Sequence, residues 1–175
     1  YDVGAKYRGA FVKGKFHGKG RYENPDKEVY EGDFEENEFV RGTHSYPGGA
    51  RFEGSFVRWR LHGKGTFTDP RGDLYEGEFT DGVLAGTGRL TSKQGGVYEG
   101  QFRQWRFHGQ GVLRLPNGDI YKGEFANGFY EGEGTLTYAT RRPDGRTHDS
   151  GRWRFGVLVD EESQRQAKVN VETAL

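Results

Sequence analysis

One short stretch decides the fold of this chain: Tyr98-Glu99-Gly100-Gln101-Phe102, with an aromatic ring, a glycine and a second ring at alternate positions. Side chains two residues apart share one face of a β-strand, so the two rings and Gly100 point to one side and the polar residues to the other. The alternation predicts a half-buried strand whose large rings lie beside bare glycine backbone.

The same pattern recurs at spacings of 22 or 23 residues. Its first ring is Tyr7, Tyr30, Phe52, Tyr75, Tyr98 or Tyr121, and its second ring is Phe11, Phe34, Phe56, Phe79, Phe102 or Phe125. Most units then carry a second glycine-containing element, such as Gly63-Lys64-Gly65-Thr66-Phe67, and turn residues such as Pro116-Asn117-Gly118-Asp119. Each unit therefore predicts a β-hairpin, and the array predicts an all-β, elongated, single-layer antiparallel meander of about six hairpins.

The repeats also set the expected boundaries. The array covers residues 1–155, with units beginning near residues 7, 30, 52, 75, 98 and 121 and a capping half-unit near residue 149. Residues 156–175 form a polar tail or connector, in which Asp160 is a suitable N-cap for a short helix, although an extended tail also fits. Because the chain lacks an initiating methionine, we expect a processed or excised piece, and its compartment is not readable from composition.

The strand register follows from pairing glycines. If Gly54 lies opposite Gly63, then Phe56 faces Leu61 and Phe52 faces Gly65. The same register places Glu53 opposite Lys64 on the outer face, which predicts a cross-strand charge pair.

Composition excludes several classes of function. The chain has 26 basic and 26 acidic side chains, so no electrostatic footprint of a nucleic-acid binder is present. It contains no cysteine, which removes disulfides and zinc–thiolate sites, and His17, His62 and His108 recur too far apart to share one metal ion. No nucleophile motif or phosphate-binding loop is present. We expect no enzyme activity, no cofactor, no metal and no nucleic-acid partner.

The repeating unit, Tyr-x-Gly-x-Phe followed by a turn and Gly-x-Gly, resembles the MORN (membrane occupation and recognition nexus) repeat from residue 7 to about residue 155. The resemblance implies a twisted single-layer sheet with an aromatic groove that serves as a protein-interaction platform or spacer.

A second resemblance concerns the whole chain. Segments such as Gly18–Asn24, Trp105–Gly111 and Leu115–Gly118 are similar to bacterial envelope lipoproteins in which a MORN array precedes a legumain-like cysteine peptidase domain. No catalytic cysteine of that family is present, so any peptidase lies outside these residues. This resemblance implies a location in the bacterial cell envelope, facing the periplasm.

Candidate partner-binding residues gather at the loop edge. Trp59 and Trp105 occupy the loop position where units one, four and six have Gly14, Gly82 and Gly128, and an arginine follows each. Tryptophan and arginine are typical of interface hot spots, although each tryptophan could instead fold back over its own hairpin. The candidate residues are Arg58, Trp59, Arg60, Trp105, Arg106 and Tyr130.

The twelve repeat aromatics are expected to form the core and, in a single-layer fold, also to line a groove. The leading hypothesis is therefore a non-catalytic module that binds a protein partner, or a covalently attached domain, through this groove or the tryptophan-bearing edge. One alternative is a structural spacer or a plate that forms a homodimer through edge strands. Another is association with lipid head groups through Arg58, Arg60, Arg103 and Arg106, which zero net charge disfavours.

Overall fold

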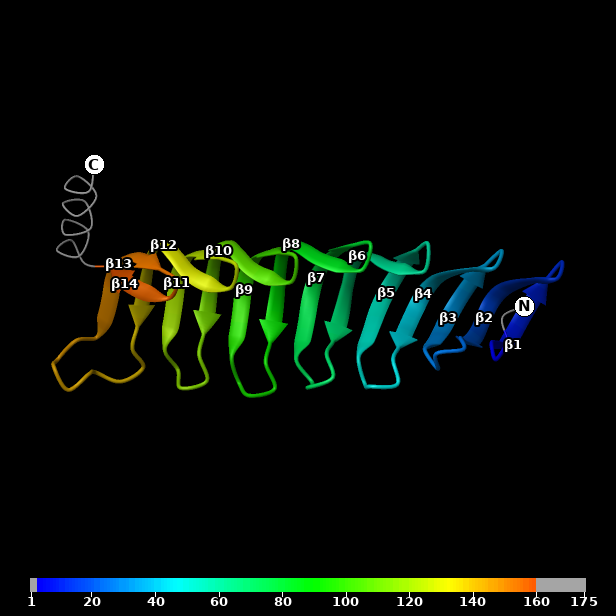
Figure 1. Cartoon of the computed structure of the whole chain (residues 1–175), viewed down its shortest axis with the longest axis horizontal. Coiled ribbons are helices and arrows are strands. Elements are labelled where there is room, and N and C mark those ends of the chain that lie inside the picture. Colours follow the sequence, from blue (N-terminus) through cyan, green and yellow to red (C-terminus); the bar gives the residue numbers. More distant parts are fainter. Residues whose placement is uncertain (1–2, 160–175) are drawn as a thin grey trace, which may run out of the picture. The chain divides into compact units, whose positions relative to one another are not determined.

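The structure, a computed structural model, describes residues 3–159, and every regular element within them is a β-strand (Figure 1). The strands are β1 (Lys6–Val12), β2 (Lys15–Glu23), β3 (Val29–Glu35), β4 (Glu38–Ser45), β5 (Arg51–Val57), β6 (Arg60–Thr68), β7 (Leu74–Thr80), β8 (Val83–Thr91), β9 (Val97–Arg103), β10 (Arg106–Arg114), β11 (Ile120–Ala126), β12 (Phe129–Thr137), β13 (His148–Arg154) and β14 (Val157–Val159).

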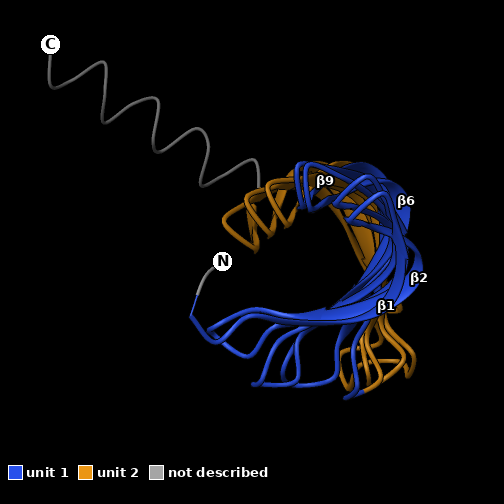
Figure 2. Cartoon of the chain, turned by 90° about the vertical axis from the view of Figure 1, so that its right-hand side faces the viewer, with its two compact units in different colours: residues 1–94 blue, residues 95–175 orange. Residues whose placement is uncertain are grey.

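The chain divides into two compact units, residues 1–94 and 95–175 (Figure 2). The first unit contains β1 to β8 and the second β9 to β14, and within each unit every strand pairs antiparallel with its neighbours in sequence. The predicted all-β meander of hairpins is confirmed. β13 and β14 form the last hairpin, so paired strands continue past the predicted boundary at residue 155. The predicted helix or extended tail from Asp160 lies outside the described residues.

Each hairpin closes through two residues of positive φ, the conformation whose twist matches that of the flanking strands. The first residue of each pair has φ between 46° and 51°, and the second between 65° and 86°. The pairs are Lys13/Gly14, Glu36/Asn37, Arg58/Trp59, Asp81/Gly82, Gln104/Trp105, Asn127/Gly128 and Phe155/Gly156. Glycine or asparagine at the second position is the expected choice, and tryptophan is the exception.

The predicted register is wrong by two residues over most of the β5–β6 hairpin. Gly54 pairs with Gly65 rather than Gly63, and Glu53 faces Thr66, while the predicted pairing of Phe56 with Leu61 is confirmed. The reason is a bulge: β6 contains extra residues between its two pairing segments.

Glycine makes this bulge geometrically accessible. Gly63 within it has a φ of 86°, and its equivalents Gly18, Gly86, Gly109 and Gly132 are also left-handed. The β3–β4 hairpin has no such glycine, and there only Val40 separates the pairs made by Phe39 and Arg41. This smaller bulge explains why the repeat that begins at residue 30 is 22 residues long, one fewer than the others. Lys64 consequently lies opposite Glu78 of the following hairpin.

The repeated glycines are required because tyrosine rings lie directly on them. A Cβ atom added to Gly111 would stand 2.5 Å from the Tyr98 ring, and one added to Gly100 would stand 2.5 Å from the Gly111 Cα. The Tyr98 hydroxyl donates to the Gln101 carbonyl at 2.7 Å, which satisfies its polar end. Burial raises the pKa of Tyr98 to about 12, so it stays a neutral donor. Tyr121 repeats the contact with Glu124 at 2.9 Å.

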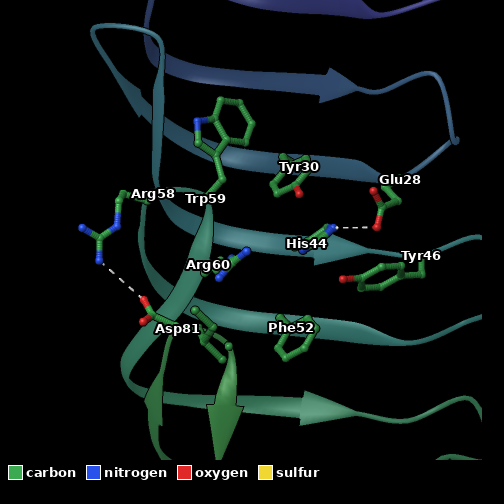
Figure 3. Close-up of a pocket in the computed structure, with 11 residues that line it drawn as sticks. Glu28, Tyr30, His44, Tyr46, Phe52, Arg58, Trp59, Arg60 and Asp81 are labelled. Atoms are coloured by element: carbon green, nitrogen blue, oxygen red, sulfur yellow. Dashed lines mark ion pairs between the residues drawn. The ribbon is translucent and has the colours of Figure 1, made fainter.

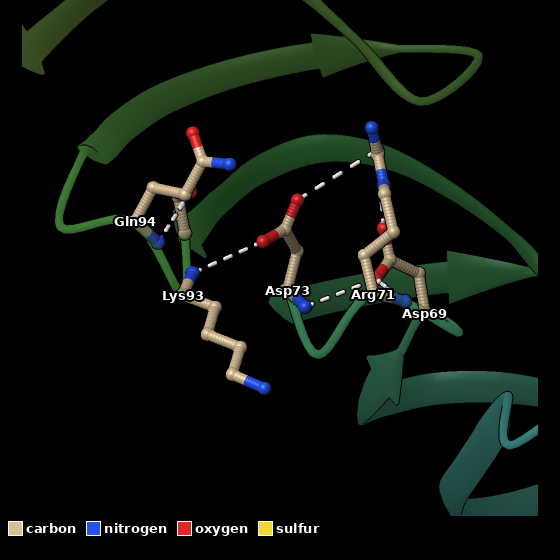
Figure 4. Close-up of polar contacts among 6 residues, drawn as sticks. Asp69, Arg71, Asp73, Lys93 and Gln94 are labelled. Atoms are coloured by element: carbon tan, nitrogen blue, oxygen red, sulfur yellow. Dashed lines mark hydrogen bonds and ion pairs between the residues drawn. The ribbon is translucent and has the colours of Figure 1, made fainter.

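Successive hairpins are tied together at both ends. At the hairpin turns, backbone N–H groups reach the preceding hairpin, as when Gly82 donates to the Leu61 carbonyl at 2.8 Å. At the opposite turns, Asp73 accepts the backbone N–H of Lys93 at 3.0 Å (Figure 4). Asp69 in turn accepts the backbone N–H groups of Arg71 and Asp73, which closes the Arg71-Gly72-Asp73 turn internally. These ties fix the stacking of hairpins and hence the positions of the rings.

Candidate functional site

The structure assigns most repeat aromatics to the core. Eight of the twelve predicted groove or core rings are buried: Tyr30, Phe34, Phe56, Phe79, Tyr98, Phe102, Tyr121 and Phe125. Tyr7, Phe52 and Tyr75 are half-buried and contribute to the surface, and Phe11 is 57% exposed. Rings contact one another from strand to strand, for example Tyr98 stacked on Phe107 with centroids 3.8 Å apart. Core and surface are therefore formed by the same ring-bearing face.

Trp59 is held in a backbone conformation that its residue type disfavours. Its φ of 65° belongs to the left-handed region, where the equivalent turn residues of the first unit are Gly14, Asn37 and Gly82. A residue with a Cβ atom costs about 1–2 kcal/mol there. A bulky side chain retained at such a position needs a compensating role in packing, binding or both.

The Trp59 indole lies on rings that precede it in sequence. Its ring meets Tyr30 at a centroid distance of 4.9 Å and an interplanar angle of 81°, and meets Tyr22 at 5.3 Å and 66°. Phe34 lies 6.0 Å away at 61°. These edge-to-face contacts match the ring quadrupoles and contribute stability beyond area burial. Trp59 thus packs on the two preceding hairpins.

The indole remains partly exposed and borders two cavities of the first unit. One, of about 360 Å³, extends from Trp59 past Tyr30 and His44 to Glu28 and Tyr46 (Figure 3). The other, of about 540 Å³, lies toward β1 and is lined by rings including Tyr7, Phe11 and Phe16. Trp59 is therefore the one predicted candidate residue that lines both of these cavities.

The smaller cavity holds an unusual polar pair, Glu28 and His44. The Glu28 Oε1 atom lies 3.4 Å from His44 Nε2, and the side chains are only 20% and 8% exposed. His44 stacks on Tyr30 with centroids 3.9 Å apart. Burial lowers the pKa of His44, although Glu28 opposes this shift, so the imidazole is neutral at pH 7. Its Nε2 atom makes no hydrogen bond.

The flanking arginines differ in their partners. Arg58 is paired with Asp81 at 3.7 Å, and both side chains are largely exposed, so this pair contributes little to stability. Arg60 lines the smaller cavity and is exposed (Figure 3).

Comparison with known proteins agrees with the repeat pattern seen in the structure. The family model described as MORN repeat matches residues 7–29, 52–74, 75–97, 98–120 and 121–141. These segments cover more than half of the chain. The chain belongs to the MORN-repeat family.

Other comparisons add less. No curated protein matches. Among solved structures, the chain is similar to the TCP domain of SAS-4 from Drosophila melanogaster, solved in complex with a proline-rich motif of Ana2. The TM-score is 0.46 at 12% identity, over 78% of this chain and 85% of that one. This likeness is too low to support an argument about function.

Between residues 7 and 141 the MORN model omits residues 30–51, and this hairpin carries the departure from the repeat. His44 pairs with Tyr30 at a position that is aromatic or aliphatic in the other complete repeats, for example Phe67 and Leu90. Glu28, His44 and Tyr46 were not predicted as site residues from the sequence. Aligning the MORN units would have shown a histidine in a column of apolar residues, and this was the available signal.

The second unit contains three of the candidate residues. Trp105 has a φ of 69° and is half-buried, and Arg106 is exposed. Tyr130 stacks on Tyr121 at 3.8 Å and meets Trp153 edge to face at 5.4 Å, so most of its contacts are internal to the MORN core.

Within residues 3–159, no group of three or more histidine, aspartate or glutamate side chains is placed to hold a metal ion, and no helix is long and apolar enough to cross a membrane.

Proposed function

We propose that this MORN array is a non-catalytic protein-interaction module and that Trp59 anchors the partner on the ring-bearing face of the first unit. The observation that carries the proposal is the tryptophan itself, which is kept at a left-handed turn position and borders two cavities. The partner is a separate protein or a domain attached to the same chain.

Packing accounts for one side of the indole and leaves its outer side for binding. Edge-to-face contacts hold Trp59 against Tyr22 and Tyr30, so its orientation is fixed before a partner arrives. A rigid, partly exposed indole beside concave surface is the arrangement found at interface hot spots, because little side-chain entropy is lost on binding. Trp105 repeats the backbone geometry and is proposed as the corresponding anchor of the second unit.

A second candidate function, self-association, is favoured by a different observation. β1 has a single neighbouring strand within the described part of the sheet, and its last residues, Phe11 and Val12, are 57% and 49% exposed. An uncovered strand edge with apolar side chains can pair with a second copy of the chain.

The experiment is affinity capture from the source organism with the wild-type chain, followed by binding measurements on the purified partner. Trp59→Gly removes the ring and keeps a residue suited to the turn. Phe155→Gly is the matched control, since Phe155 is also a ring in a two-residue turn and is 66% exposed. We expect Trp59→Gly to weaken binding at least roughly tenfold and the control to leave it unchanged. Equal binding by both variants would exclude Trp59 as the anchor.

A further inference from the structure

Two polar atoms at the smaller cavity, Glu28 Oε1 and His44 Nε2, face each other without a hydrogen bond. The Glu28 Oε2 atom accepts a hydrogen bond from the side-chain amide of Asn24, and the Oε1 atom faces His44 Nε2 at 3.4 Å. Nε2 is buried and has no hydrogen-bond partner. The separation of 3.4 Å is too long for a good hydrogen bond, so Glu28 Oε1 keeps acceptor capacity that a ligand in the cavity could use.

Glu28 has no paired cation in the cavity wall. Its side chain is four-fifths buried, and among residues 3–159 its one ionic contact is with His44, which is neutral at pH 7. A desolvated carboxylate without a cation is costly. Arg60 lines the same cavity, but it is exposed and makes no ion pair within the described chain, so solvent screens its charge.

The surroundings of Glu28 and His44 are aromatic. Tyr30 stacks on His44, Tyr46 lies 4.5 Å from the imidazole between ring centroids, and Trp59 closes the opposite side of the cavity (Figure 3). A carboxylate among aromatic rings is the environment that binds organic cations, because the rings attract the charge and exclude water.

We propose that this cavity binds a basic side chain of the partner, whose cationic N–H group donates to Glu28 Oε1. This rests on the proposed function only in that the partner supplies the cation. An anion would be repelled by Glu28, and a metal ion would lack ligands, since no third metal-binding side chain joins the pair within the part of the chain that the structure describes. The cavity of about 360 Å³ is large enough for one such side chain.

The test uses small probes on the whole chain: n-butylammonium and n-butylguanidinium as cations, with butyrate and butanol as anionic and neutral controls. NMR follows the His44 ring protons and the Trp59 indole N–H. We expect saturable shifts with the cations and none with the controls. Failure of both cations to give saturable shifts would overturn the proposal, as would butanol or butyrate binding equally well.

Three variants locate the cation. Glu28→Gln keeps the side-chain shape and an oxygen for the Asn24 amide, so it is expected to fold, and circular dichroism checks this. It should weaken cation binding about tenfold, as for the loss of one charge-assisted hydrogen bond. Glu35→Gln is the matched control on the exposed end of β3 and should change nothing. Arg60→Gln removes a positive charge from the cavity wall and should strengthen cation binding; a loss there, or unchanged binding by Glu28→Gln, would contradict the assignment.

The outcome is separable from that of the proposed function. If Trp59→Gly abolishes partner binding while the probes do not bind, the docking proposal stands and the cation site is wrong. If the probes bind as expected but Glu28→Gln leaves partner affinity unchanged, the partner supplies no cation, and the inference is likewise wrong.

Discussion

Replacing Trp59 separates the strain of its backbone from the packing of its ring. Both Trp59→Ala and Trp59→Gly remove the edge-to-face contacts with Tyr22, Tyr30 and Phe34. At roughly 0.5–1.5 kcal/mol for each such contact, and with some compensation from solvent, the loss is about 2 kcal/mol in either variant. The two variants differ in how they fit a φ of 65°.

The alanine variant keeps the strain of a left-handed residue, about 1–2 kcal/mol, whereas glycine releases it. Glycine also gains about 0.4–1 kcal/mol of unfolded-state entropy, which acts against the folded state. The glycine variant should therefore be the more stable by about 0.5–1 kcal/mol, the reverse of the usual order. For a domain of this size, this corresponds to a melting temperature roughly 2 °C higher.

Thermal unfolding followed by circular dichroism measures this order. Gly82→Ala is the matched control, since Gly82 occupies the same turn position with a φ of 79° and an added Cβ would meet nothing within 4 Å. It should lower stability by about 1 kcal/mol through backbone strain alone. A Trp59→Gly variant that melts below Trp59→Ala would refute the reasoning about strain.

Three further outcomes are expected. Gly111→Ala places a Cβ atom 2.5 Å from the Tyr98 ring and should lower the free energy of unfolding in urea by more than about 2 kcal/mol. Gly128→Ala adds a Cβ atom in open space and should lower it by about 1 kcal/mol. Equal losses in the two variants would contradict the packing of rings on glycines. Burial lowers the folded-state pKa of His44, so the unfolded chain binds the proton more tightly and stability should fall as pH drops below about 6.5. His44→Leu should remove this pH dependence of stability. An unchanged pH profile in that variant would exclude His44 as its source. Phe11→Lys should abolish any concentration-dependent increase in mass in sedimentation, and an increase that persists would exclude the β1 edge as its cause.

The hairpin array was predictable because its signal is local and repeated. Alternation around Gly100 specifies a strand, and recurrence at a fixed spacing specifies stacking. The register was not predictable from glycine pairing, because the bulge at Gly63 depends on a left-handed backbone that leaves no mark on side-chain alternation. Only the shorter repeat, which begins at residue 30 and lacks this glycine, indicated that the second strand of the other hairpins contains extra residues.

Some residues of the proposed site were named from the sequence and others were not. The turn position of Trp59 followed from aligning the units, but its contact partners did not, since an indole can reach the preceding hairpins only once their spacing and twist are known. Glu28 and His44 were missed because neither belongs to a catalytic or metal-binding motif, and their pairing requires a turn to approach the end of β4.

The central claim, that the face around Trp59 binds a protein partner, is tested most directly by site-specific photocrosslinking in the source cells. A photoreactive phenylalanine analogue at Arg60, beside the smaller cavity, should crosslink a defined partner, and the added substitution Trp59→Gly should abolish the product. The same analogue at the exposed Glu35 should give no such product. Equal crosslinking from both positions, or a product at Arg60 that survives Trp59→Gly, would contradict the account.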